Sequence, residues 1–222
     1  MTLLTPIDTY TDVFLLNHPL VSDSLSVLRD KDTPCPVFRQ ETQRIGEYLM
    51  IEATRSLPTI EKVVETPLES TSQTVLDPHH HVVICPILRA GLGLSDSAQR
   101  ILPKATVHHI GLFRDEETLQ PVTYYNKMPQ VSNPQQTTTF LVDPMLATGG
   151  SAVAAVDCLK ETGMIASNIV FVCLISAPEG INTLKEAHPE VRIVTAAIDR
   201  QLNEVGYIVP GLGDAGDRIF AT

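Results

Sequence analysis

Small residues and hydroxyls gather in the segment 143–151, which reads DPMLATGGS. It follows an apolar run, and Thr148 begins a TGGS stretch at the point where a helix is expected to start. Glycines let the main chain approach an anion closely, and the N–H groups of a first helical turn point at it. The segment therefore predicts a phosphate site, with Asp143 placed to accept hydrogen bonds from ribose hydroxyls. The alternative is a plain Gly-Gly turn in which Ser151 only caps the helix.

Charged residues follow other apolar runs at the places where strands are expected to end. Arg89, Arg114 and Asp199 each come directly after such a run. In open parallel sheets ligands bind beyond the carboxyl ends of the strands. A purely structural sheet needs turns there, but not two arginines and a glycine-serine loop. We therefore expect these residues to share one rim with the segment 143–151.

The elements that must hold this rim alternate along the chain from residue 82 onward. Five short apolar runs predict strands, and three stretches between them have the length of short helices. Because several runs are apolar nearly throughout, we expect strands that are covered on both faces. The predicted fold class is α/β, an open doubly wound parallel sheet with crossover helices. The strands are expected at Val82–Leu88, Thr106–Phe113, Thr138–Val142, Ile169–Ile175 and Val191–Ile198, and the helices at Leu94–Leu102, Ser151–Glu161 and Ile181–His188.

Other stretches depart from that alternation. Residues 114–137 form a long polar link with three prolines and no clear period. Links of this length inside a compact domain are usually functional or disordered, so we interpret this one as a mobile flap over the site; a surface loop without a role is the alternative. Near the N-terminus, apolar residues at helical spacing predict a helix over Glu41–Arg55, whereas residues 57–81 fit no element.

The segment 143–151 closely resembles the phosphate loop of the type I phosphoribosyltransferases, in the form found in uracil phosphoribosyltransferases. Most of the wider superfamily has two adjacent acids where this chain has Asp143 followed by Pro144, and the single acid is characteristic of the uracil branch. The likeness spans nearly the whole chain and is weakest in residues 57–81. Its other segments are HPLV at 18–21, PILRAGLG at 86–93, DEETLQPV at 115–122, APEGI at 177–181 and IDRQLNEVGYIVPGLGDAGDR at 198–218.

The resemblance implies a reaction of pyrimidine salvage, in which uracil and 5-phospho-α-D-ribose 1-diphosphate (PRPP) give UMP and diphosphate. It implies that Arg89, Arg114 and Asp214 are catalytic, and that Mg²⁺ is held through the diphosphate with no residue assigned as a direct metal ligand. For Arg114, a solvated charge on the flap is the alternative. Uracil is implied to bind near Ile208, Gly213, Asp214 and Ala215. The PRPP contacts are implied to be Arg89, Arg114, Asp143, Pro144, Met145, Leu146, Ala147, Thr148, Gly149, Gly150, Ser151 and Asp214.

The resemblance also implies one domain over residues 1–222, with a core sheet at about 82–199 and with the long flap and the N- and C-terminal additions forming a hood. A homo-oligomer is implied, and some members of the family are activated allosterically by GTP. Two other functions stay open: a non-catalytic, ligand-sensing regulator with the same fold, and a transferase for another nucleobase. Loss of the arginines or of Asp214 would have favoured the regulator, and competition between bases would reveal the other transferase.

Three patterns point to other chemistry and are set aside. Gly211, Gly213 and Gly216 satisfy the dinucleotide fingerprint G-x-G-x-x-G, but the chain ends too soon for the helix and second strand it requires. Residues 79–81 are consecutive histidines, which cannot all face one metal ion from a strand. Ser151 has no G-x-S-x-G elbow around it, so a hydrolase nucleophile is not supported.

Charge, hydropathy and cysteine spacing limit the kinds of partner and the cellular location that we expect for the chain. The formal net charge of −10 disfavours nucleic acid, whose phosphates call for a basic face. No apolar run approaches the roughly 20 residues of a membrane span, and the N-terminus lacks the basic start of a secretory signal. The four cysteines are widely spaced, which argues against a disulfide framework and for a cytoplasmic location.

Overall fold

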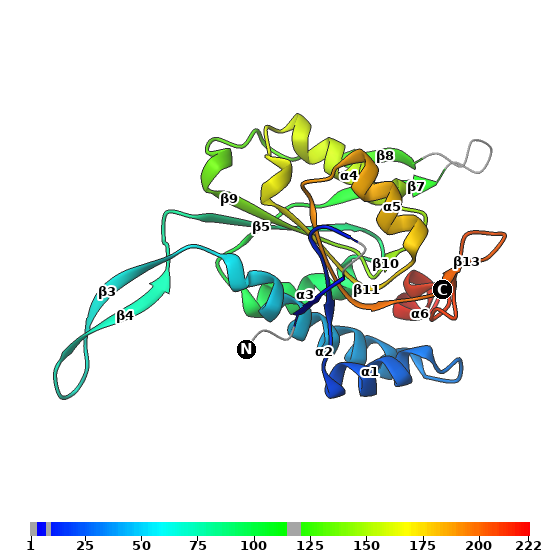
Figure 1. The fold of residues 1–222 in the computed structure, drawn as a ribbon, viewed down its shortest axis with the longest axis horizontal. Coiled ribbons are helices and arrows are strands. Elements are labelled where there is room, and N and C mark those ends of the chain that lie inside the picture. Colours follow the sequence, from blue (N-terminus) through cyan, green and yellow to red (C-terminus); the bar gives the residue numbers. More distant parts are fainter. Residues whose placement is uncertain (1–3, 8–9, 115–120) are drawn as a thin grey trace.

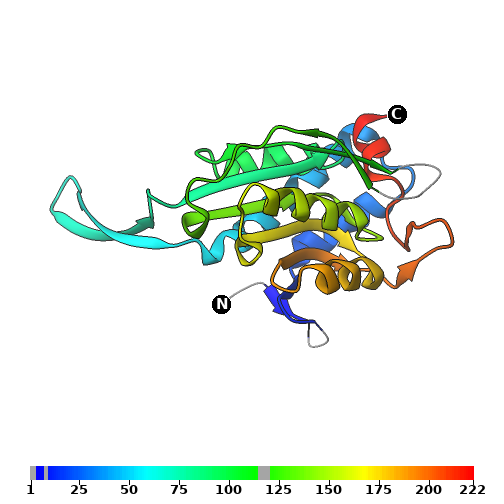
Figure 2. The ribbon, with the colours of Figure 1, turned by 90° about the horizontal axis from the view of Figure 1, so that it is seen from above.

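A mostly parallel sheet forms the centre of the protein, and helices cover both of its faces (Figure 1, Figure 2). This computed structural model describes residues 4–7, 10–114 and 121–222. The strand order is β1-β2-β12-β11-β9-β5-β7-β8, with antiparallel strands at the two edges and parallel strands between them. The strands are β1 (Leu4–Pro6), β2 (Val13–Leu16), β12 (Arg192–Ile198), β11 (Ile169–Ser176), β9 (Thr137–Val142), β5 (His81–Leu88), β7 (Ile110–Arg114) and β8 (Pro121–Asn126); β10 (Met145–Leu146) joins β11 and β6 (Thr106–Val107) joins β5.

The helices divide between the two faces because the central strands are apolar on both sides. In β9, Phe140 and Val142 pack toward one face and Leu141 toward the other, and all three are fully buried. Successive side chains of a strand point to opposite faces, so one apolar run can serve two cores. On one face lie α1 (Pro19–Arg29), α2 (Cys35–Ala53), α3 (Leu92–Ile101) and α6 (Ala215–Phe220), and on the other lie α4 (Gly150–Glu161) and α5 (Pro178–Ala187) (Figure 1).

The predicted α/β class and the alternation of strands and helices are confirmed, with small shifts at the ends of elements. The run expected as one strand at Thr106–Phe113 is interrupted at residues 108–109, and both pieces, β6 and β7, pair with β5. The helix expected at Glu41–Arg55 begins six residues earlier, at Cys35. Pro36 stands in its first turn, where a missing N–H costs nothing.

The link 114–137 is more regular than the sequence indicates. The strand β8 pairs with β7 as an antiparallel edge, and a short 3-10 helix covers Pro134–Gln136. The absence of a clear period in the sequence therefore did not reveal this strand or the short helix. An edge strand that begins with proline and exposes its polar residues gives no apolar alternation to detect. The tip of the expected flap, residues 115–120, lies outside the described residues.

Residues 57–81, which fit no element, form a long hairpin of β3 (Thr59–Glu65) and β4 (Ser70–Leu76) that extends away from the body (Figure 1). Most of its side chains are exposed, among them Val63 at 70% and Leu68 at 94%. A hairpin with no buried face lacks the period-two pattern that predicts a strand. Across the described ranges of the chain, none of the helices combines the length and the apolar character that a membrane crossing needs.

Candidate active site

The segment 143–151 joins the end of β9 to the start of α4, as expected. Gly149 sits at the N-cap of α4 with φ +85°, a conformation that L side chains rarely adopt. A Cβ placed on it would lie 2.7 Å from the Cβ of Thr183 in α5. Glycine is therefore required here both by the main-chain conformation and by the neighbouring helix. The first N–H groups of α4 have no acceptor inside the helix, so they are available to an anion in front of the loop.

The helix α5 supports this loop from behind. A Cβ on Gly180 would lie 2.6 Å from the carbonyl oxygen of Leu146, so only glycine lets the two segments touch. Just before α5, the N–H of Ala177 donates to the same carbonyl at 2.9 Å. The APEGI segment therefore acts as a support for the loop, a role that its sequence did not indicate.

A pocket of about 280 Å³ opens in front of the loop. Three separate parts of the chain line it: Ala90 after β5, most of the segment from Asp143 to Ala152, which runs from the end of β9 into the first turn of α4, and residues 214–216 at the start of α6. The structure thus brings together the segment 143–151, called the donor loop because PRPP is the expected ribose donor, and part of the C-terminal segment. They meet at the carboxyl ends of the strands. A larger cavity of about 400 Å³ lies at the amino end of β5, against the base of the β3–β4 hairpin. Its walls are largely apolar, so we take the smaller pocket as the candidate site.

Two carboxyl groups face this pocket. Asp143 is partly buried and accepts a hydrogen bond from the N–H of Met145 at 3.3 Å. Burial raises the pKa of Asp143 to about 7; the Met145 hydrogen bond opposes this rise, and the charge of Asp214 adds to it. Asp214 is exposed and caps α6 by accepting from the N–H of Asp217 at 2.9 Å. Two carboxylates near an anion site would repel the ligand, so the arrangement suits an anion that arrives with a cation.

Arg89 follows β5 directly, beside Ala90 of the pocket wall. Its side chain is 61% exposed and only loosely held, 3.7 Å from Asp217 and 6.0 Å from the ring centre of Phe220. A weakly paired surface arginine can turn toward a ligand at little cost. Arg114 is the last residue of β7, and its side chain lies outside the described part of the structure.

The structure separates the other expected base contacts. Ala215 and Asp214 line the pocket, whereas Ile208, in β14 (Ile208–Val209), is 4% exposed and packs in the core. Gly213 is exposed with φ +79° and does not line the pocket. Any contact between Ile208 and a base must therefore use its main chain. In the loop, Pro144 and Gly150 also do not line the pocket.

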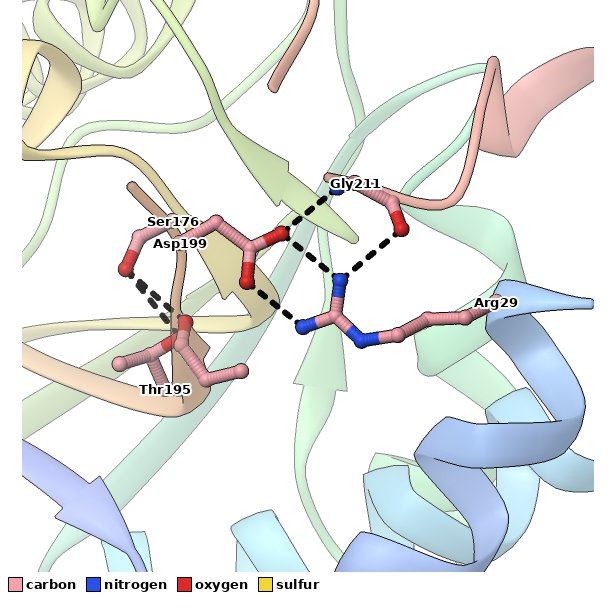
Figure 3. A network of polar contacts seen from close by, with 6 residues as sticks. Arg29, Ser176, Thr195, Asp199 and Gly211 are labelled. Carbon is pink, nitrogen blue, oxygen red and sulfur yellow. Dashed lines mark hydrogen bonds and ion pairs between the residues drawn. The ribbon is translucent and has the colours of Figure 1, made fainter. Parts of the chain in front are cut away.

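A polar network that sequence reasoning missed lies behind the C-terminal segment (Figure 3). Asp199, expected as a carboxylate on the rim, is instead paired with Arg29 of α1 at 2.6 Å and bonded to the N–H of Gly211 at 2.8 Å. Nearby, Ser176 bonds to Thr195 at 3.4 Å and so ties β11 to β12. Arg29 and Asp199 are 170 positions apart in the chain, and no local pattern relates them.

The patterns that were set aside do not form sites. The glycines at 211, 213 and 216 lead only into the six-residue helix α6. His80 bonds to Thr138 at 2.8 Å, while His79 and His81 are exposed. Within the described residues, no group of three or more His, Cys, Asp or Glu side chains could hold a metal ion.

Comparisons with known proteins find relatives over nearly the full length of the chain. A family model described as uracil phosphoribosyltransferase matches residues 15–222. A protein of Streptococcus pneumoniae named uracil phosphoribosyltransferase is 53% identical over 208 residues, covering 94% of this chain and 97% of that protein. One of the same name from Dictyoglomus thermophilum is 53% identical over 210 residues, covering 95% of this chain and 99% of its own.

Solved structures give the same fold. The AQ2163 protein from Aquifex aeolicus superposes with a TM-score of 0.86 at 34% identity, over 95% of this chain and 98% of that one. The adenine phosphoribosyl transferase from Trypanosoma brucei reaches a TM-score of 0.55 at 13% identity, over 88% and 86% of the two chains. The second likeness supports the architecture alone.

Proposed function

The chain belongs to the uracil phosphoribosyltransferase family, and we propose that its pocket in front of the DPMLATGGS loop joins uracil to the ribose of PRPP. The products are UMP and diphosphate, so the enzyme is a pentosyltransferase of pyrimidine salvage. The observation that carries this assignment is the meeting of the donor loop with residues 214–216 at one pocket. The bond from C1 of the ribose to diphosphate breaks as the bond to N1 of uracil forms; the diphosphate leaves with the electron pair and takes up the proton that N1 loses.

The donor's 5-phosphate fits the start of α4. Ser151 and Thr148 offer hydroxyls at the pocket, and Gly149 lets the main chain come close to the phosphate oxygens. The dipole of α4 and the free N–H groups of its first turn favour an anion at this position. Asp143 stands where it can accept from the ribose hydroxyls once it is ionised. The whole loop from Asp143 to Ser151 is proposed to contact PRPP.

Arg89 and Arg114 are proposed to stabilise the leaving diphosphate. Negative charge grows on it as the C1–O bond breaks, and guanidinium groups bind such oxygens in bidentate fashion. Mg²⁺ is proposed to enter with PRPP and, when bound, to neutralise part of this charge. The oxygen donors that Mg²⁺ prefers are present in Asp143 and Asp214, both on the pocket wall. No side chain is required as a nucleophile, so positioning and charge stabilisation supply the catalysis.

Uracil is proposed to lie against the main chain of residues 208–215. Its N3–H donor between two carbonyl acceptors can be matched by backbone groups, whereas cytosine presents the opposite edge at two positions. A mismatched edge would leave buried polar groups unpaired, which is an effective means of discrimination. We also propose that the link 114–137 covers the reacting centre and excludes water, which would otherwise hydrolyse the donor.

The decisive assay uses purified protein, labelled uracil, PRPP and Mg²⁺. We expect labelled UMP and an equal amount of diphosphate, with loss of the reaction when a chelator removes Mg²⁺. Unlabelled cytosine and hypoxanthine should compete poorly with uracil. Absence of UMP would refute the function, and preferred use of another base would transfer the assignment to that base. PRPP binding without turnover would revive the ligand-sensing regulator.

We propose in addition that the chain forms a homo-oligomer through the β3–β4 hairpin. Isolated two-stranded hairpins are marginal in water, and this one exposes Val63 and Leu68 far from the core. Light scattering should give a multimeric mass that falls when both residues are changed to lysine.

Activation by GTP is proposed from the family alone, and a titration of the rate with GTP tests it. A cytoplasmic location fits the four free cysteines, and localisation of a tagged chain tests it.

A further inference from the structure

The carboxylate of Asp199 and the guanidinium of Arg29 form a buried clamp behind the C-terminal segment (Figure 3). Asp199 follows β12 and its side chain is 5% exposed; Arg29 ends α1 and its side chain is 27% exposed. The pair is bidentate: Nη1 lies 2.8 Å from Oδ2, and Nη2 lies 2.6 Å from Oδ1. Such fork-to-fork pairs fix orientation as well as distance.

Both members of the clamp also hold the main chain of Gly211. Its N–H donates to Oδ2 of Asp199 at 2.8 Å, and its carbonyl accepts from Nη1 of Arg29 at 2.9 Å. Gly211 has φ +64°, so the chain turns sharply at this point. These two groups belong to the peptide units on either side of Gly211, so neither unit can rotate without breaking a charge-assisted hydrogen bond. The turn is therefore fixed three residues before Asp214, the first residue of this segment that lines the pocket.

A second arginine holds the next peptide. Arg218 of α6 donates to the carbonyl of Leu212 at 2.8 Å and to that of Asp30 at 2.5 Å, and its guanidinium lies 4.2 Å from the ring centre of Phe38. It also donates to the carbonyl of Leu28. Two successive carbonyls, those of Gly211 and Leu212, are thus occupied by guanidinium groups. The end of α1 and the C-terminal segment around Gly211 and Leu212 are therefore held together.

The pairing also removes a charge from the rim. Asp199 stands at the carboxyl end of β12, on the same edge of the sheet as the donor pocket. An unpaired carboxylate there would repel the phosphates of PRPP. Because Asp199 is paired with Arg29, it adds no net charge to this edge of the sheet, and we do not expect it to bind PRPP.

We infer that Arg29 and Asp199 are positioning residues for the acceptor base, acting through Gly211 on the main chain of residues 213–215. This inference depends on the proposed function, because it assigns that segment to uracil. The site then has two halves. The donor loop is held by α5, and the segment that would bind uracil, residues 213–215, is held by α1 through the clamp. Disturbing the clamp should therefore weaken uracil binding and leave PRPP binding nearly intact.

The test compares steady-state constants of Arg29→Met, Arg29→Lys and the charge-free double variant Arg29→Met/Asp199→Leu with the unaltered enzyme. We expect the KM for uracil to rise roughly ten- to a hundredfold in Arg29→Met, since hydrogen bonds to charged groups are lost. The KM for PRPP should change by less than about threefold. Arg29→Lys keeps the charge and should recover part of the loss. The double variant avoids an unpaired buried carboxylate but also loses the acceptor of the Gly211 N–H, so its KM for uracil should rise at least as much as that of Arg29→Met.

Arg100→Met is the matched control, since Arg100 pairs with Glu47 at 2.7 Å on the exposed side of α3. It should leave both constants unchanged. Equal rises in the two KM values, or an unchanged KM for uracil, would overturn the inference. If Arg29→Met does not fold, Arg29→Lys decides by the same ratio of constants. Failure of the unaltered enzyme to make UMP would count against the proposed function instead, so the two failures are distinguishable.

Discussion

Asp143 links the stability of the fold to pH. Burial raises the pKa of its carboxyl from the ordinary 3.8 to about 7, the Met145 N–H opposes the rise, and Asp214 adds to it. In the unfolded chain the carboxyl ionises near its ordinary pKa, whereas in the folded protein it stays protonated to a higher pH. The folded state is therefore fully stable with respect to this group below pH about 4, and it loses stability as the pH rises toward 7.

The size of this loss follows from the difference between 3.8 and about 7. At about 1.4 kcal/mol for each pH unit the full effect is about 4 kcal/mol. The residue as a whole is only partly buried and lines the pocket, where water lowers the cost, so we expect about 2–4 kcal/mol. Asp143→Asn removes the charge and keeps an oxygen for the Met145 N–H. This variant should be more stable than the unaltered protein by that amount at pH 8, and equally stable near pH 4.

Urea unfolding from pH 4 to 8.5, without ligands, measures the difference directly. Asp23→Asn serves as the control, because the side chain of Asp23 is 71% exposed and the change should have little effect at any pH. The more stable Asp143→Asn protein should nevertheless be a poor enzyme, since it loses the acceptor proposed for ribose. If its advantage at pH 8 is absent, or is the same at pH 4, then burial does not hold this carboxyl in an unfavourable charged state.

The donor loop and the cysteines provide three further tests. Gly149→Ala adds a methyl group against α5 at φ +85° and should lower the free energy of unfolding by about 1–3 kcal/mol; a urea midpoint equal to that of the unaltered protein would contradict this. Ser151→Ala should raise the KM for PRPP roughly tenfold and leave that for uracil unchanged in steady-state assays, whereas equal changes would argue against a donor role. Burial raises the pKa of Cys85 and Cys173 to about 12, so a thiol reagent at pH 8 should label the partly exposed Cys35 first; mass spectrometry that finds either of the other two labelled early would refute this.

Much of the fold could be predicted because the central strands are buried on both faces. The run Ile169–Ile175 is apolar throughout, and it became the fully buried β11. The elements that escaped prediction share the opposite property. The hairpin of β3 and β4 and the edge strand β8 are exposed, so selection for burial left no periodic pattern in them. Their strands are paired by main-chain hydrogen bonds, which any side chain except that of proline permits.

The candidate site divides in the same way, between local and distant contacts. The donor loop lies within nine consecutive residues, and its conformation is decided by the glycine at 149, the helix that follows and the strand before it. A site of this kind can be predicted from the sequence alone. The acceptor side depends on Arg29 and Asp199, which the sheet and α1 bring together from distant parts of the chain. Only the folded structure reveals that pair, and the same separation has a chemical consequence. Because different elements hold the two halves, changes near α1 can alter the choice of base while the donor loop stays as it is.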